Sequence, residues 1–324
     1  MIETLSYDDV LLQPRLGVLN KRRDADISTE LFADIPLDIP ILSAPMTSVT
    51  GPGMCNAMRQ NGGIGVLPRF GWSIEESVAI AETHAGNKCL WAIGLDLERY
   101  EALYSAGVRW FCFDVAHAHH KAVGAFLSAL PHRDDIFLMA GNVGTQEGAQ
   151  FLADLGVDAI KVGIGPGAAC RTREVTGFGI GQLSAVIQVA NFLRNDHSAT
   201  SVRGSRITIV ADGGIKNSGD IVKALAAGAD SVMLGKLLAQ SNEAPGNGQY
   251  YGMASKRING HYAPEGAEGT VELRGPVRDI LKELTWGLKS GISYAGATNL
   301  HELRENAVWQ RVTPAVRFES SVRL

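Results

Sequence analysis

The chain has 324 residues, of which 45% are hydrophobic and 20% are charged, and its formal net charge is -4. This length suits one α/β barrel or two smaller domains. The balanced charge argues against a strongly basic protein that binds nucleic acid or a membrane surface. The first residues lack the basic start and apolar run of a signal peptide, and no apolar stretch is long enough to cross a bilayer. We therefore expect a cytoplasmic protein without nucleic-acid or membrane partners.

Eight short apolar runs follow one another along the chain, and each precedes a segment that can form a helix. Such runs are typical of parallel strands that are buried on both faces. Residues 146–155 and 219–227 show the amphipathic pattern of intervening helices. Eight such units predict one domain, residues 1–324, folded as a (β/α)8 TIM barrel, with a doubly wound sheet as the alternative. The runs are residues 39–46, 63–69, 89–94, 110–115, 136–143, 159–165, 207–214 and 231–238.

Polar groups and glycines lie directly after several of these runs. In a parallel barrel these positions share the carboxyl-end rim, where catalytic groups collect. Asp114, Asn142 and Asp212 are lone polar residues of this kind. Glycine after a strand can equally serve a turn. Residues 240–269, which contain several glycines and two prolines, follow the last run, and we expect them to form a long loop.

Cys170 is the cysteine with the most reactive sequence context. It follows a glycine-rich stretch and stands between Arg171 and Arg173, and cationic neighbours favour the nucleophilic thiolate. A packed, inert loop thiol is the alternative. The other cysteines, Cys55, Cys89 and Cys112, lie in apolar surroundings and are expected to be small buried hydrophobes. No CxxC pair or zinc-type spacing occurs, so neither a disulfide framework nor a structural metal site is expected.

Two glycine-rich strand ends late in the chain have the character of a phosphate site. Backbone amides of Gly213, Gly214 and Gly235 can face an anion, and Lys236 adds a positive charge. The Asp212 carboxylate is suited to accept hydrogen bonds from ribose hydroxyls, although a turn or helix-capping role is the alternative. No GxGxxG fingerprint follows the first run and no Walker A loop occurs, so neither a Rossmann domain nor a nucleotide hydrolase is indicated.

The segments GIGPGAACRTREVTGFGIGQLSA, VADGGI, VMLGKLLA, YYGMAS and PEGAEG occur in this order. Together they resemble the inosine monophosphate (IMP) dehydrogenase and guanosine monophosphate (GMP) reductase family. The likeness runs from SYDDVLLQP to HELRENAVWQRVTP, almost the whole chain. It implies a TIM barrel, usually a homotetramer, in which a cysteine bonds to carbon 2 of a purine nucleoside monophosphate.

The resemblance also implies a role for individual residues. Cys170 matches the nucleophile, Thr172 the threonine near it, and Glu265 the glutamate of the proton-transfer apparatus. Residues matching the substrate site are Met46, Asp212, Gly213, Gly214, Gly235, Lys236, Tyr250, Gly252 and Met253, of which Asp212 matches the ribose ligand. The cofactor is expected at Asp114, Ala116, His117, Gly141 and Asn142. Family members often bind a monovalent cation such as potassium, here through carbonyls of Gly165, Gly167 and Cys170.

The two reactions of the family differ in how the cysteine adduct is resolved. The dehydrogenase activates water with an Arg-Tyr pair, whereas this chain has His261 and Tyr262 at that place, and Arg257 is the conceivable substitute. Residues 176–179, TGFG, resemble reductases, while PEGAEG and ELRENA resemble dehydrogenases. No room is left for the regulatory CBS insert between the second and third strands. We predict a GMP reductase that uses NADPH. The alternatives are an IMP dehydrogenase without the insert, using NAD, and a non-catalytic nucleotide-binding barrel.

The chain departs from the family pattern in the expected phosphate site. Ala168 replaces a serine of the cysteine loop, and Lys236 replaces the serine that follows the glycine of the eighth strand. A lysine can substitute a charge for a lost hydroxyl contact. The change is equally consistent with a different phosphorylated purine, such as a deoxynucleotide or a modified base. The cluster His117, His119 and His120 lacks carboxylate partners in the sequence, so we expect a solvated or cofactor-contacting loop there rather than a metal site.

Overall fold

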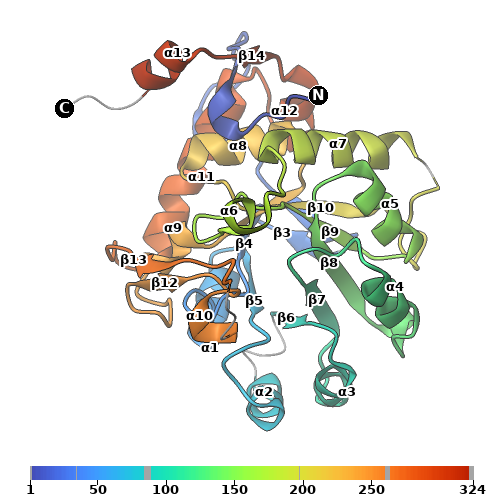
Figure 1. Cartoon of the computed structure of the whole chain (residues 1–324). Coiled ribbons are helices and arrows are strands. Elements are labelled where there is room, and N and C mark those ends of the chain that lie inside the picture. Colours follow the sequence, from blue (N-terminus) through green and yellow to red (C-terminus); the bar gives the residue numbers. More distant parts are fainter. Residues whose placement is uncertain (1, 34, 84–88, 197, 260–262, 321–324) are drawn as a thin grey trace.

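The computed structural model of the chain describes residues 2–33, 35–83, 89–196, 198–259 and 263–320. Eight parallel strands form a closed barrel in chain order, and the last strand pairs with the first (Figure 1). Each strand lies within one of the eight predicted runs. The predicted barrel is confirmed, and the closure excludes the doubly wound sheet. The strands are β4 (Ile41–Ser43), β5 (Ile64–Leu67), β6 (Leu90–Ile93), β7 (Trp110–Asp114), β8 (Phe137–Val143), β9 (Ala159–Val162), β10 (Thr208–Asp212) and β11 (Ser231–Leu234).

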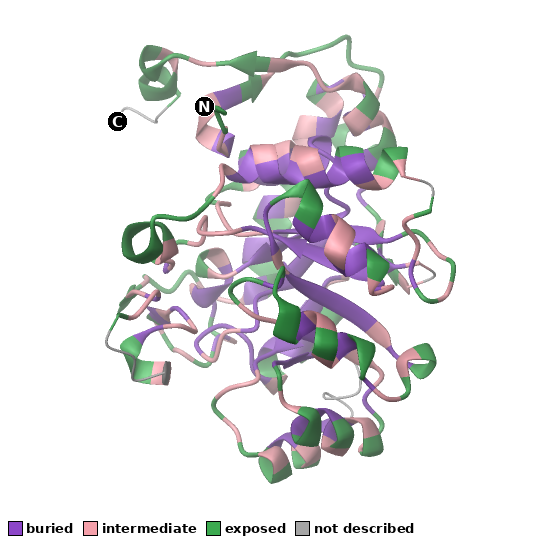
Figure 2. Ribbon diagram, turned by 45° about the vertical axis from the view of Figure 1, so that its right-hand side comes forward, coloured by how far each residue is buried: buried purple, intermediate pink, exposed green. Residues whose placement is uncertain are grey.

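Helices surround the barrel, with buried faces toward the strands and exposed faces outward (Figure 2). Their starts follow from local sequence: Ser73, Asp96, Thr145 and Asn217 each precede a helix and accept a hydrogen bond from its first turn. The helices are α1 (Pro52–Gln60), α2 (Ile74–Ala81), α3 (Leu97–Ser105), α4 (Lys121–Ser128), α5 (Gln146–Asp154), α7 (Gln182–Asn195), α8 (Ser218–Ala226), α11 (Val277–Tyr294) and α12 (Leu300–Asn306).

The amino end of the barrel is closed by a hairpin. Strands β2 (Thr29–Phe32) and β3 (Ile35–Leu37) pair antiparallel outside the barrel. Thr208, the first residue of β10, donates to the Leu31 carbonyl at 2.5 Å. Phe32 stacks on Phe137 with ring centroids 5.1 Å apart, and the interior side chains above them are apolar. Because this end is filled, access to the barrel is left to the carboxyl ends of the strands.

Residues 240–269 are not the irregular loop that the sequence predicts. They contain β12 (Gln249–Tyr251) and β13 (Glu268–Thr270), which pair antiparallel, and the helix α10 (Lys256–Asn259). Three-residue strands show no measurable periodicity, and their pairing joins residues far apart in sequence, so the local pattern misses them. The pairing places Tyr250 and Tyr251 at one end of this segment near Glu268 at the other.

Segments near the two ends of the chain lie side by side. Strand β1 (Val10–Leu12) pairs antiparallel with β14 (Trp309–Arg311), and α13 (Pro314–Glu319) follows (Figure 1). Two further short helices, α6 (Thr172–Thr176) and α9 (Lys236–Ala239), follow β9 and β11 at the carboxyl ends. In the part of the chain that the structure describes, no helix combines the length and apolar character needed to cross a membrane.

Candidate functional site

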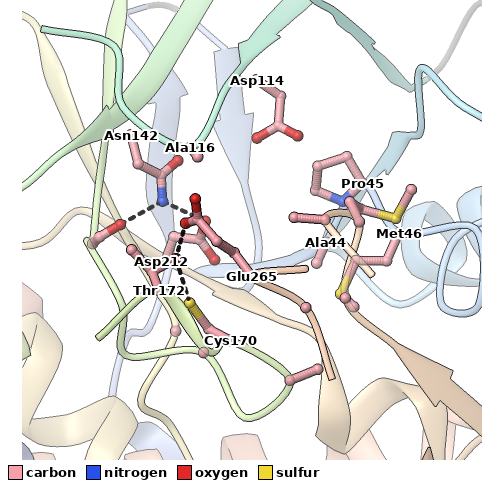
Figure 3. Close-up of a pocket in the computed structure, with 18 of the residues that line it drawn as sticks. Ala44, Pro45, Met46, Asp114, Ala116, Asn142, Cys170, Thr172, Asp212 and Glu265 are labelled. Atoms are coloured by element: carbon pink, nitrogen blue, oxygen red, sulfur yellow. Dashed lines mark hydrogen bonds between the residues drawn. The ribbon is translucent and has the colours of Figure 1, made fainter. Parts of the chain in front are cut away.

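The carboxyl ends of the strands open into a cavity of about 300 Å³. Residues from six of the eight strand ends line it, together with residues of the segment that runs from β12 to β13 (Figure 3). Cys170, Thr172 and Glu265 lie together on one side, and Asp114 and Asn142 lie across from them (Figure 3). The barrel therefore gathers groups that are far apart in sequence.

Cys170, Thr172 and Glu265 form a hydrogen-bonded chain. The Cys170 Sγ lies 3.2 Å from Thr172 Oγ1, and Thr172 Oγ1 donates to Glu265 Oε2 at 2.7 Å. The backbone holds this arrangement in place, because the amide of Arg171 donates to the Glu265 carbonyl at 2.6 Å and Cys170 bridges to Gly266. A proton can pass from thiol to hydroxyl to carboxylate along this chain without a large movement.

The arginines beside Cys170 bind groups other than its sulfur. Arg171 forms an ion pair with Glu174 at 3.1 Å, and the Arg173 guanidinium donates to the Ile180 carbonyl at 2.5 Å. Both guanidinium groups thus have partners other than the sulfur. Adjacency in sequence does not fix where a long side chain points. The thiol faces Thr172 instead.

Lys161 is the buried cation of the site. Its side chain is 2% exposed, and its Nζ lies 2.7 Å from Asp114 Oδ1 and 3.1 Å from Asp212 Oδ2. Asn142 accepts from the same ammonium, and its Nδ2 donates to Asp212 Oδ2 at 3.0 Å. Burial by itself lowers the pKa of Lys161, but the attraction of the two carboxylates outweighs it and raises the pKa above its usual value. The lysine is therefore charged.

Close backbone approach explains the glycines around the cysteine loop. Gly163 has φ +153°, and a Cβ there would lie 2.2 Å from the Asp212 carbonyl oxygen. Gly213 has φ +91°, and its Cβ would lie 3.1 Å from the amide nitrogen of Gly167. The loops after β9 and β10 are consequently packed backbone against backbone. This contact brings the cysteine loop next to Asp212.

The cavity gathers fourteen of the nineteen residues that the sequence proposes for the site. These are Met46, Asp114, Ala116, Asn142, Gly165, Gly167, Cys170, Thr172, Asp212, Gly213, Tyr250, Gly252, Met253 and Glu265. The remaining five are His117, Gly141, Gly214, Gly235 and Lys236, which do not line it. Gly235 is still close, since a Cβ there would lie 2.9 Å from the Tyr250 hydroxyl and 3.2 Å from Met46 Sδ.

The histidines after β7 have separate local contacts. His120 precedes α4 and accepts the Ala122 amide at 3.1 Å, while His119 packs on the ring of Phe151. His117 is exposed, and partial burial together with its two histidine neighbours lowers its pKa. Among the described residues, no group of three or more histidine, cysteine or acidic side chains is arranged to hold a metal ion.

Lys161, Arg69 and Phe70 line the cavity although the sequence reasoning did not select them. The Arg69 guanidinium lies over the Phe70 ring at 4.0 Å, and its buried Nε has no hydrogen-bond partner among the described residues. A lysine inside an otherwise apolar run was a usable signal for Lys161, because an unpaired charge is not tolerated there. Arg69 follows β5 and was equally visible as a polar residue at a strand end.

Arg257, the conceivable substitute for the water-activating arginine, contacts residues outside the cavity lining. Its guanidinium donates to the Gln249 side chain at 2.8 Å and lies over the Tyr251 ring, outside the cavity lining. His261 and Tyr262 lie outside the described residues. The cysteines Cys55, Cys89 and Cys112 are buried and outside disulfides, as expected.

A protein-family model matches almost the whole chain. Residues 4–323 match the family model described as "IMP dehydrogenase / GMP reductase domain". The chain belongs to this family. The inosine-5'-monophosphate dehydrogenase of Aquifex aeolicus is 41% identical over 250 residues, which cover 70% of this chain and 49% of the relative. That of Methanocaldococcus jannaschii is 40% identical over 259 residues, 69% of this chain and 50% of the relative.

A third relative matches over its whole length. The inosine-5'-monophosphate dehydrogenase of Nitrosopumilus maritimus is 28% identical over 473 aligned positions, which cover 98% of both chains. The chain spans about half the length of the relatives that it matches at about 40% identity.

Proposed function

We propose that this chain exchanges hydride between carbon 2 of a purine nucleoside 5'-monophosphate and a nicotinamide dinucleotide, through a covalent bond to Cys170. The observation that carries the proposal is the hydrogen-bonded chain from Cys170 Sγ through Thr172 to Glu265, set in a cavity that also holds Asp212. A nucleophile beside a proton acceptor is the arrangement that covalent catalysis needs. A barrel that only binds nucleotides has no use for it.

The nucleotide's ribose and phosphate have suitable partners in this site. Asp212 is half-buried and lines the cavity, so its carboxylate can accept hydrogen bonds from the ribose hydroxyls. The Tyr250 hydroxyl lies close to the backbone after β11, since a Cβ at Gly235 would lie 2.9 Å from it, and we assign the phosphate to this place. Lys236 at the start of α9 adds a positive charge. Met46 and Met253 offer apolar contacts to the purine ring.

The residues across the cavity fit a nicotinamide dinucleotide. Asp114 turns one carboxylate oxygen to Lys161 and leaves the other without a partner in the described part of the chain, which suits a sugar hydroxyl. Ala116 beside it has only a methyl side chain and leaves space. The nicotinamide ring supplies the hydride acceptor or donor when it is bound. Carbonyls of Gly165, Gly167 and Cys170 remain the proposed potassium ligands, and one of them, Gly167, already accepts the Cys170 amide at 3.0 Å.

For the direction of the reaction we place oxidation of IMP with NAD first, because the relatives reported above are named as dehydrogenases. The Cys170 thiol loses its proton to solvent by way of Thr172 and Glu265 and attacks carbon 2 as the thiolate. The hydrogen of carbon 2 leaves as hydride to NAD, and a thioimidate then joins Sγ to carbon 2. Water then adds to carbon 2 as its proton passes through Thr172 to Glu265. The carbon–sulfur bond breaks, which releases xanthosine monophosphate and the thiolate. In this scheme the Thr172 and Glu265 pair activates water in place of the Arg-Tyr pair, whose arginine this chain replaces with His261.

GMP reduction, the reaction that the sequence favours, is the second candidate. One observation supports it: Arg257 is held outside the cavity, so it does not supply the water-activating arginine. In this direction Cys170 attacks carbon 2 of GMP, and Glu265 returns a proton through Thr172 as ammonia leaves. Hydride from NADPH then adds to carbon 2, the carbon–sulfur bond breaks, and IMP is released.

Two absorbance assays separate the directions. The purified chain with IMP and NAD is expected to form NADH and xanthosine monophosphate. NADPH consumption and ammonia release with GMP, and no NADH from IMP, would establish the reductase instead. Activity in neither assay, with unchanged nucleotide binding, would support the non-catalytic barrel and contradict the proposal.

We also propose three features outside the site, namely an uninterrupted barrel, a homotetramer and a cytoplasmic location. Strand β5 connects to β6 through a short segment that holds α2, so we propose that no regulatory insert interrupts the barrel there. The 473 positions aligned to the Nitrosopumilus maritimus relative exceed the 324 residues of this chain, which agrees with a relative that carries additional segments. A homotetramer located in the cytoplasm remains our proposal from the family resemblance.

A further inference from the structure

Lys161 is a buried charged group that the proposed mechanism does not use. It projects from β9 between Asp114 at the end of β7 and Asp212 at the end of β10, and it contacts both carboxylates. Asn142 joins the same group from β8 and also donates to the Gly163 carbonyl at 2.8 Å. Four consecutive strand ends are therefore tied together by residues that line the cavity.

In the described part of the chain, these contacts leave one oxygen of each carboxylate without a hydrogen bond, and both aspartates line the cavity. Lys161 and Asn142 both bond to Oδ2 of Asp212, and no described group bonds to Oδ1. A carboxylate held through one oxygen by two donors has a fixed plane, and its second oxygen keeps a fixed direction. This fixed oxygen is the acceptor that the proposed function assigns to the ribose hydroxyls.

We propose that Lys161 is a positioning residue that sets the preference of this site for a ribonucleotide, by locking Asp212 with its Oδ1 toward the sugar. The inference rests on the proposed function, because it needs the nucleotide ribose at Asp212. A freely rotating carboxylate loses conformational entropy when the nucleotide binds, and this loss weakens binding. A carboxylate that is already held in place avoids this loss. The alternative is that Lys161 only neutralises two buried carboxylates and contributes stability.

The test compares the dissociation constants of IMP and its 2',3'-dideoxy analogue by titration calorimetry on the full chain. IMP is substrate in one proposed direction and product in the other, so the test does not depend on the direction. Wild-type protein is expected to prefer IMP by at least about tenfold, the scale of a hydrogen bond to a charged group. Lys161→Met is expected to reduce the preference to within about twofold, while both nucleotides still bind.

Two further variants keep the test informative. Lys161→Met combined with Asp114→Asn preserves the charge of the group, because it removes one cation and one anion, and it is expected to fold and to show the same lost preference. Lys223→Met is the matched control. Its ammonium is also mostly buried, 2.8 Å from the Tyr7 carbonyl and 3.7 Å from Asp220, but it lies on α8 away from the cavity. It is expected to lose stability and keep the full preference.

The ribose contact of Asp212 and the positioning role of Lys161 are tested by different results. Equal binding of the two nucleotides by the wild-type protein would overturn the ribose role of Asp212, and the inference with it. A wild-type preference that survives in both Lys161 variants would overturn the inference alone and leave Lys161 with a stabilising role. Loss of the preference in the Lys223 control would likewise contradict it, because general destabilisation would then explain the effect.

Discussion

Thr172 is the residue that connects the nucleophile to the proton acceptor, since Cys170 and Glu265 both bond to its hydroxyl. The sequence indicated Cys170 through its local context, and it indicated Thr172 and Glu265 only through the family resemblance. Thr172 and Glu265 lie 93 positions apart, so no local pattern connects them. Lys161 and Arg69 were missed, since a side chain's direction into a cavity depends on the closed barrel.

Replacement of Glu265 by glutamine is expected to lower kcat by about 10²–10⁴-fold, because the amide cannot accept the proton that Thr172 passes on. The KM of the nucleotide is expected to change little, as Glu265 is not assigned to its binding. Steady-state kinetics with Glu272→Gln as a control check this, because Glu272 is exposed and outside the cavity lining. Equal kcat in wild type and Glu265→Gln would remove the carboxylate from the reaction.

At the scale of elements, the eight barrel strands were predictable because each is a run of apolar residues with both faces buried. The strands β12 and β13 were not, because β13 is fully exposed and both are three residues long. Their existence depends on pairing with each other across the residues between them. A linear pattern contains no signal for such pairing.

Gly163→Ala tests the backbone contact between the ends of β9 and β10. Its Cβ would lie 2.2 Å from the Asp212 carbonyl oxygen, so overlap adds to the strain of a positive φ. We expect the free energy of unfolding in urea to fall by at least about 3 kcal/mol, together with loss of nucleotide binding.

Gly107→Ala is the matched comparison, because Gly107 has φ +93° and no atom within 4 Å of its added Cβ. Strain alone is expected to cost about 1–2 kcal/mol there, with binding preserved. Equal losses in the two variants would show that the strand ends are not closely packed as described.

Over the whole molecule, Asp230 joins the base of the barrel to the C-terminal helices. Its side chain is 2% exposed and meets Arg206 at 2.9 Å and Arg304 of α12 at 3.1 Å, and it also accepts the Ile209 amide. Asp230→Ala removes the buried acceptor that the Ile209 amide, Arg304 and the partly exposed Arg206 share. We expect the free energy of unfolding to fall by about 3–5 kcal/mol, with kcat of the folded protein unchanged.

A surface pair provides the control for this prediction. Glu283→Ala removes the partner of Arg274, and both side chains are largely exposed, so it is expected to cost less than about 1 kcal/mol. Chemical denaturation of both variants checks the difference. Similar small losses would mean that the Asp230 cluster does not hold α12 to the barrel.

The central claim is a covalent bond between Cys170 and the purine, and mass spectrometry of acid-quenched protein tests it most directly. Samples quenched during turnover, first with IMP and NAD and then with GMP and NADPH, are digested and searched for a nucleotide-modified peptide. The account predicts a purine nucleotide mass on the peptide that contains Cys170, and neither adduct nor turnover in Cys170→Ala, which still binds nucleotide. Undiminished turnover by Cys170→Ala would contradict it.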